Sequence, residues 1–128
     1  MDKRPLREGY NILIADRNPH VRKLLRREMR LEGYQVQLAK TGREVINYTL
    51  QEDSFDLLIL DPDLPDTDES SLLKKLRERI PPLPVVVHSF LSKNNEQPDV
   101  LTTVIFVEKR GSSIDHLKKI VAEILERV

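Results

Sequence analysis

Short runs of apolar residues recur along the chain and alternate with longer segments of mixed polarity. Four unbroken runs lie at Ile12–Ala15, Leu57–Leu60, Val85–Val87 and Val104–Val107. Apolar residues in an unbroken run, bounded by polar ones, are typical of a strand that is buried on both faces of a sheet. The stretch from Tyr34 to Ala39 alternates in part and predicts one more strand.

The segments between these strands carry apolar residues at the spacing of amphipathic helices. Four groups have this spacing: Val21, Leu24, Leu25 and Met29; Val45, Ile46 and Leu50; Leu72, Leu73, Leu76 and Ile80; and Ile114, Leu117, Ile120, Val121, Ile124 and Leu125. Each group predicts one helix with its apolar side turned toward the strands.

Local signals mark several helix ends. Asn18 followed by Pro19 predicts the start of the first helix, and Gly33 predicts its end. Thr41-Gly42-Arg43-Glu44 fits a capping box at the start of the second helix. Between Leu91 and Thr103 the composition disfavours helix, so we expect a fourth helix there that is short or irregular.

The alternation of strands and helices predicts an α/β fold with a doubly wound, five-stranded parallel sheet and helices on both faces. A length of 128 residues fits one domain. We assign residues 1–10 to a polar N-terminal tail and residues 11–128 to the domain. Since the chain ends with its last predicted helix, no DNA-binding or enzymatic output domain is expected.

Charge and composition exclude several function classes. Acidic and basic residues number 21 each, so the net charge gives no support to direct nucleic-acid binding. Basic residues do gather on the first helix, where we expect a solvated face: Arg22, Lys23, Arg26, Arg27 and Arg30. The chain has no cysteine for a disulfide, a thiolate metal site or a nucleophile. No apolar run reaches the roughly 18 residues of a membrane helix and no signal-peptide core is visible, so we expect a cytoplasmic protein without a membrane partner.

Polar side chains follow four of the predicted strands. Asp16, Asp61, Ser89 and Lys109 stand at, or directly after, the carboxyl ends of the first, third, fourth and fifth strands. In a doubly wound sheet these ends share one edge, and ligands bind at that edge. We therefore expect the four side chains to converge on a functional site.

The residues at these strand ends resemble those of a response-regulator receiver domain, the CheY-like family of two-component signalling. That family has its phosphoacceptor aspartate in a D-x-x-[LM]-P motif after the third strand, which Asp61-Pro62-Asp63-Leu64-Pro65 matches. Ser89 matches the family's hydroxyl residue, Lys109 its lysine, and Phe106 its aromatic switch residue. The resemblance covers residues 11 to 127 and implies the flavodoxin-like strand order 2-1-3-4-5.

The same resemblance implies a Mg²⁺ ion held by acidic residues, here Asp16 and Asp61, with Asp63 as a candidate replacement ligand that more readily faces solvent. Arg17 stands where receivers usually carry a second acidic residue, and a guanidinium has no lone pair to offer a metal. We therefore expect Mg²⁺ binding to be weak or absent. Arg17 either pairs with Asp61 or points into solvent, and the sequence leaves both alternatives open.

Two hypotheses for the function follow from this resemblance. The first is an atypical receiver that is impaired in Mg²⁺-dependent phosphorylation and acts as a protein-interaction module; Arg17, and Arg110 in place of the usual proline after Lys109, favour it. The second is a working phosphoacceptor that takes a phosphoryl group from a histidine kinase on Asp61. We favour the first. The resemblance implies a signalling module rather than an enzyme, with a histidine kinase or another signalling protein as partner, and it also allows a homodimer.

Overall fold

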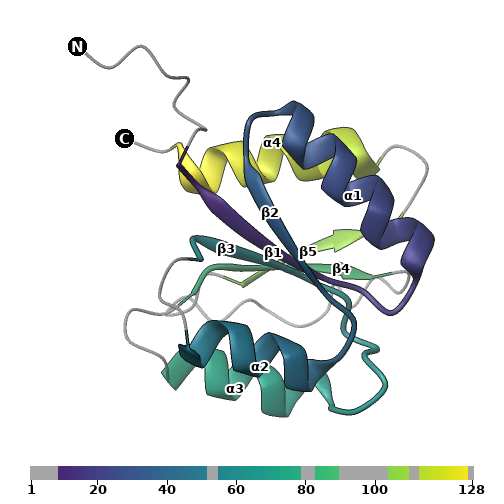
Figure 1. The fold of residues 1–128 in the computed structure, drawn as a ribbon, viewed down its shortest axis with the longest axis vertical. Helices are drawn as coiled ribbons and strands as arrows, with labels where there is room; N and C mark the ends of the chain where they lie inside the picture. Colours follow the sequence, from purple (N-terminus) through teal and green to yellow (C-terminus); the bar gives the residue numbers. More distant parts are fainter. Residues whose placement is uncertain (1–8, 52–54, 79–82, 90–103, 110–112, 127–128) are drawn as a thin grey trace.

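A five-stranded parallel sheet forms the centre of the molecule, and helices cover both of its faces (Figure 1). The computed structural model describes residues 9–51, 55–78, 83–89, 104–109 and 113–126. The strands are β1 (Asn11–Ala15), β2 (Gln35–Ala39), β3 (Leu57–Leu60), β4 (Val85–Ser89) and β5 (Val104–Glu108). The helices are α1 (Pro19–Leu31), α2 (Gly42–Gln51), α3 (Glu69–Glu78) and α4 (Ser113–Leu125).

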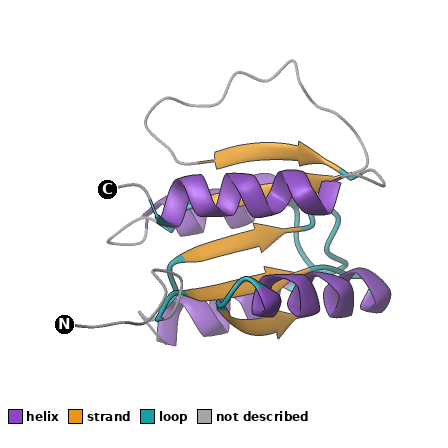
Figure 2. Cartoon of the chain, turned by 90° about the horizontal axis from the view of Figure 1, so that it is seen from above, coloured by secondary structure: helices purple, strands orange, loops and turns teal. Residues whose placement is uncertain are grey.

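The strands follow one another across the sheet in the order β2-β1-β3-β4-β5, which confirms the predicted topology. All four neighbouring pairs are parallel, and Figure 2 shows the strand arrows pointing the same way. Strand β3 lies in the middle of this order. Its carboxyl end is therefore flanked by the carboxyl ends of β1 and β4.

The core consists of two layers, one on each face of the sheet. Successive residues of a strand point to opposite faces. Ile12 and Ile14 of β1 accordingly join the layer formed with α1 and α4, whereas Leu13 and Ala15 join the layer formed with α2 and α3. All four residues of β3 are buried, as its unbroken apolar run predicts.

The residues predicted to mark the helix ends do so in the structure, except that the Glu44 side chain has a different hydrogen-bond partner. The Asn18 side chain accepts hydrogen bonds from the amides of His20 and Val21 at the start of α1. Gly33 follows α1 with a φ of 99°, a left-handed conformation that favours glycine. At α2 the amide of Glu44 donates to Thr41 Oγ1, but the Glu44 carboxylate accepts from the amide of Lys40 rather than closing a capping box on Thr41.

Two apolar residues of the predicted helices lie away from the core. Leu24 on α1 is 43% exposed and Leu50 on α2 is 66% exposed, whereas Leu25 and Val45 of the same helices are buried. The predicted short or irregular helix between Leu91 and Thr103 lies outside the described residues, as does the third-helix position Ile80. In the described ranges, no helix is long and apolar enough to cross a membrane.

Candidate functional site

Two aspartates lie on neighbouring strands at the carboxyl edge of the sheet. Ala15 of β1 and Leu60 of β3 are register partners, so Asp16 and Asp61 come directly after them. The amide of Asp61 donates to the Ala15 carbonyl across 2.8 Å. Only 1% of Asp16 and 2% of Asp61 is exposed. Carboxylates buried this deeply need hydrogen bonds or a cation.

Lys109 provides a cation to Asp16. Its Nζ lies 2.9 Å from Oδ2 of Asp16, and 6% and 2% of the two side chains are exposed. The backbone amide of Lys109 also donates to the carbonyl of Ser89 across 2.6 Å, which holds the residue after β5 against the end of β4. A charge-assisted bond of this length in a nearly dry site is among the stronger polar contacts of a protein.

Arg17 contacts two aspartates of the loop that follows β3, Asp61 and Asp63. Its backbone amide donates to Oδ2 of Asp61 across 3.1 Å, and its Nε lies 3.6 Å from the same oxygen. Its Nη2 lies 3.7 Å from Oδ2 of Asp63, whose side chain is mostly exposed. The Arg17 side chain itself is 51% exposed. Both alternatives for Arg17 thus hold in part, because the guanidinium pairs with Asp61 and still meets solvent.

The remaining carboxylate oxygens accept hydrogen bonds from the loops that follow β1 and β3. The amide of Asn18 donates to Oδ1 of Asp16 across 2.9 Å, and the amide of Asp63 donates to Oδ1 of Asp61 across 3.0 Å. With the contacts to Lys109 and Arg17, each of the four oxygens of the two buried carboxylates has an N–H or ammonium partner.

Ser89 and Phe106 lie where the sequence predicts them. Ser89 is the buried last residue of β4 and pairs with Glu108 in the ladder between β4 and β5. Phe106 pairs with Val87 in the same ladder, but its side chain lies outside what the structure describes. The assignment of Ser89 to phosphoryl sensing and of Phe106 to a switch therefore stays a prediction.

Residues 12–121 match the family model for the response regulator receiver domain. The matched region begins in β1, contains Asp16, Asp61 and Lys109, and ends in α4. The chain belongs to the response regulator receiver family. This confirms the resemblance carried by the residues at the strand ends.

This receiver domain is similar to parts of longer signalling proteins. It is 40% identical over 80 residues to the sensor protein EvgS of Escherichia coli K12, a match that covers 62% of this chain and 7% of EvgS. It is 42% identical over 69 residues to the two-component response regulator ARR22 of Arabidopsis thaliana, which covers 53% of this chain and 49% of ARR22. The chain therefore spans less than half the length of each of these relatives.

Solved structures of receiver domains share the fold. The receiver domain of the hybrid histidine kinase CckA superposes with a TM-score of 0.73 at 31% identity, over 90% of this chain and 98% of that one. The chemotaxis response regulator CheY4 of Vibrio cholerae superposes with a TM-score of 0.77 at 20% identity, over 91% and 98% of the two chains. The second likeness concerns the fold alone.

At the sheet edge of this receiver domain, a Mg²⁺ ion would meet the guanidinium of Arg17 beside the carboxylates of Asp16 and Asp61. Magnesium requires near-octahedral oxygen ligands. The buried oxygens of Asp16 and Asp61 already have N–H or ammonium partners, and Arg17 brings donors without a lone pair. Within the described ranges, no three side chains of the types His, Cys, Asp or Glu are grouped as metal ligands.

Burial also affects the ionisation of the site. It raises the pKa of the Asp16 carboxyl above its ordinary value, and the Asp61 charge acts in the same direction. The hydrogen bond from the Asn18 amide and the contact with the Lys109 ammonium lower that pKa again. The short contact with Lys109 therefore counteracts the cost of burying a carboxylate in this receiver domain.

Two residues form contacts near the site that the sequence did not predict. Arg22, assigned to a solvated basic face, is half-buried, and its Nη1 donates to the carbonyl of Asp16 across 2.6 Å. His88 is buried at the end of β4, and its Nε2 lies 3.2 Å from Oγ of Ser113, the first residue of α4. The available signal for His88 was a histidine within an otherwise apolar run; no spacing pattern indicates its contact with a residue 25 positions away.

Proposed function

We propose that this chain is an atypical receiver, impaired in Mg²⁺-dependent phosphorylation of Asp61, that acts as a regulatory protein-interaction module rather than as an enzyme. The observation that carries the proposal is the position of Arg17, whose guanidinium lies 3.6 Å from Asp61 and 3.7 Å from Asp63. Among receivers this position usually holds an acidic residue. Here a cation of the protein itself pairs with the aspartate that would accept the phosphoryl group.

The chemistry of phosphoryl transfer supports this proposal. A carboxylate that attacks a phosphoryl group brings two anions together, and metal ions normally bridge and neutralise the reacting oxygens. Arg17 supplies positive charge at Asp61 but no metal ligand. It also occupies Oδ2 of Asp61 with a backbone hydrogen bond and a side-chain ion pair, which leave this oxygen less free to attack a phosphoryl group.

The partner that we propose is a histidine kinase or another signalling protein in the cytoplasm. Similarity to the sensor protein EvgS and to the receiver domain of the hybrid histidine kinase CckA supports this choice. The activity of the whole EvgS protein is not transferred to this chain, because the match covers 7% of EvgS. Recognition by the partner would then depend on the surface of the domain rather than on the phosphorylation state of Asp61.

The Arg17→Asp substitution tests the proposal. It changes the formal charge of the site by two units, and unit charges 4 Å apart interact by about 4 kcal/mol at an effective dielectric constant of 20. It also adds an oxygen ligand beside Asp16. We expect the variant to bind Mg²⁺ in the millimolar range, at least about tenfold more tightly than the natural protein, and to label on Asp61 with acetyl phosphate. Calorimetry measures the metal, and mass spectrometry measures the label.

Arg30→Asp is the matched control, since Arg30 is an exposed residue in the last turn of α1 and its replacement changes the charge equally. We expect this variant to behave like the natural protein in both measurements. If the natural protein already binds Mg²⁺ and labels on Asp61 as well as the Arg17→Asp variant does, Arg17 is a bystander and the chain is an ordinary phosphoacceptor.

A further inference from the structure

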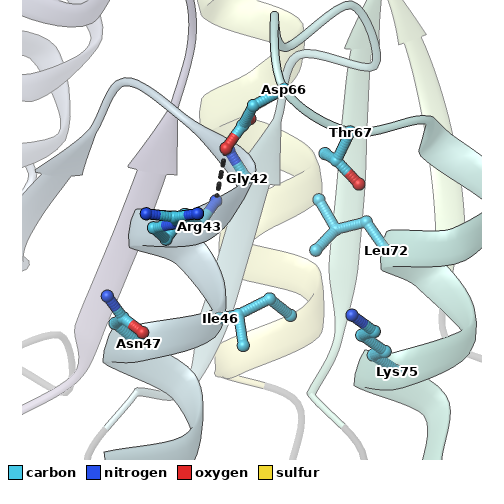
Figure 3. A pocket seen from close by; sticks show the side chains of 8 residues that line it. All are labelled: Gly42, Arg43, Ile46, Asn47, Asp66, Thr67, Leu72 and Lys75. Carbon is cyan, nitrogen blue, oxygen red and sulfur yellow. Dashed lines mark hydrogen bonds between the residues drawn. The ribbon is translucent and has the colours of Figure 1, made fainter.

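A cavity of about 290 Å³ lies between α2 and α3, on the face of the sheet opposite α1 and α4 (Figure 3). Ile46 of α2 and Leu72 of α3 form its apolar part, and Figure 3 shows them turned toward each other. Its volume is close to the lower end of small-molecule sites, which begin at about 300 Å³. A ligand of one ring or a few carbon atoms fits a space of this size.

Cations line this cavity from both helices. Arg43 belongs to α2 and Lys75 to α3, and Figure 3 shows the amino group of Lys75 directed toward α2. In the part of the chain that the structure describes, neither side chain forms an ion pair, unlike Arg17, Arg27, Lys109 and Lys118. The amide of Asn47 and the hydroxyl of Thr67 add neutral hydrogen-bonding groups.

Asp66 determines where an acidic ligand group can lie. Its carboxylate accepts hydrogen bonds from the amides of Gly42 (2.6 Å) and Arg43 (3.0 Å), so the amino end of α2 is already occupied by an anion. These two bonds lower the pKa of the Asp66 carboxyl, which keeps it charged. A second anion is repelled from that end of the cavity. The acidic group of a ligand is therefore directed to Arg43, Asn47 and Lys75.

We propose that this cavity binds a small organic acid, with its anionic group between Arg43 and Lys75 and its apolar part against Ile46 and Leu72. Apolar walls with a few convergent polar groups are the usual composition of a ligand site. The proposal does not depend on how Asp61 functions. Because Asp66 and Thr67 belong to the loop that also carries Asp61 and Asp63, a bound acid would contact the loop of the candidate site.

The test uses the full ¹⁵N-labelled chain and three probes that cannot transfer a phosphoryl group. Phenylphosphonate carries both a ring and an anion, methylphosphonate has the anion with a single methyl group, and benzamide has the ring without a charge. We expect phenylphosphonate to shift the amide signals of residues 42–47 and 66–75 in a saturable manner. We expect methylphosphonate and benzamide to bind at least about tenfold more weakly, because each lacks one of the two contacts.

Substitutions of exposed residues separate a site from general charge attraction. Lys75→Gln and Arg43→Gln should each weaken phenylphosphonate binding at least about fivefold, the range of a charge-assisted hydrogen bond. Lys74→Gln is the matched control, because Lys74 is an exposed neighbour on α3 that does not line the cavity. Lys74→Gln should change the affinity for phenylphosphonate less than twofold, and this affinity should depend on salt as it does in the natural protein.

Three results would overturn the proposal. One is the absence of saturable shifts with phenylphosphonate. Another is a set of shifts centred on the basic helix α1 or on Asp16 and Asp61 at the sheet edge. The third is an equal loss of affinity in Lys74→Gln and Lys75→Gln, which would show that the acid is attracted by surface charge alone.

Discussion

His88 combines burial with an incompletely satisfied ring. Only 3% of the residue is exposed, its Nε2 lies 3.2 Å from Ser113 Oγ, and its Nδ1 has no hydrogen-bond partner among the described residues. The pKa of His88 is lowered to about 4, first by burial and second by the Lys109 charge, while the Asp61 charge opposes both. The ring is therefore neutral at pH 7, and a proton on it would add a second buried cation near Lys109.

A pH-dependent loss of stability follows from His88. The folded-state pKa of about 4 lies below the ordinary value of 6.5, so the unfolded chain binds the proton more readily. The free energy of unfolding should fall as the pH drops from about 6.5 to about 4, and stay unaffected by this group above that range. The full effect is at most about 3 kcal/mol. Urea unfolding at pH 7.0 and 4.5 measures it.

Two histidine variants separate the pH effect of His88 from the titration of the carboxylates. His88→Leu should lose less stability than the natural protein between the two pH values, because it has no ring to protonate. His20→Gln, at an exposed position, should follow the natural protein. Equal losses in His88→Leu and the natural protein would mean that His88 takes up no additional proton on unfolding.

At the scale of elements, the start of α2 packs closely against the loop that follows β3. A Cβ atom placed on Gly42 would lie 2.9 Å from Thr67 Cβ and would overlap the Thr67 methyl group. The Asp66 carboxylate beside Thr67 binds the first two amides of the same helix. Glycine at position 42 is thus required for close approach of the loop to the helix.

The Gly42→Ala substitution should therefore destabilise the protein in spite of the higher helix propensity of alanine. We expect a loss of about 1–3 kcal/mol in the free energy of unfolding, as for other overpacked sites. Thr67→Ser removes the overlapping methyl group, so the double variant should recover part of the loss. A urea-based double-mutant cycle measures this coupling, and additive effects would argue against the contact.

Elements were easier to predict from the sequence than the contacts between them. The cap at Asn18, the end at Gly33 and the buried run of β3 are local features, and so they appear in the sequence. The arrival of Asp16 and Lys109 at one edge followed from parallel topology. The hydrogen bonds between Asp66 and the start of α2 join residues that are 23 and 24 positions apart. They depend on side-chain directions that no local pattern specifies. The rotamer of Arg17 was undetermined for the same reason.

At the scale of the whole molecule, the sheet joins two hydrophobic layers that share its central strand. Leu58 belongs to the layer with α2 and α3, and its neighbour Ile59 to the layer with α1 and α4. Both side chains are 0–1% exposed. By contrast, Val36 of the edge strand β2 is only partly buried. The free energy of unfolding that is lost when a strand side chain is truncated should therefore decrease from the central strand β3 toward the edge strand β2.

Alanine substitutions test this gradient. Leu58→Ala and Ile59→Ala should each cost about 2–5 kcal/mol in the free energy of unfolding, because each leaves a cavity in a closed layer. Val36→Ala should cost less than half as much, since solvent already reaches that position. Urea unfolding measures all three, with unchanged m-values as the sign that the cooperative unit is intact. A loss for Val36→Ala as large as that for Leu58→Ala would contradict a core centred on β3.

The hydrogen bonds of the Asp66 carboxylate make the first amides of α2 sensitive to opening of the loop that holds Asp61. The first amides of any helix have no partner within the helix, so at α2 those of Gly42 and Arg43 owe their protection to Asp66. Each time the loop lifts away, both amides meet water and can exchange their hydrogens with solvent deuterium. The hydrogen-exchange rates of these two amides therefore report how often the loop opens. They do so from α2, an element that does not contain Asp61.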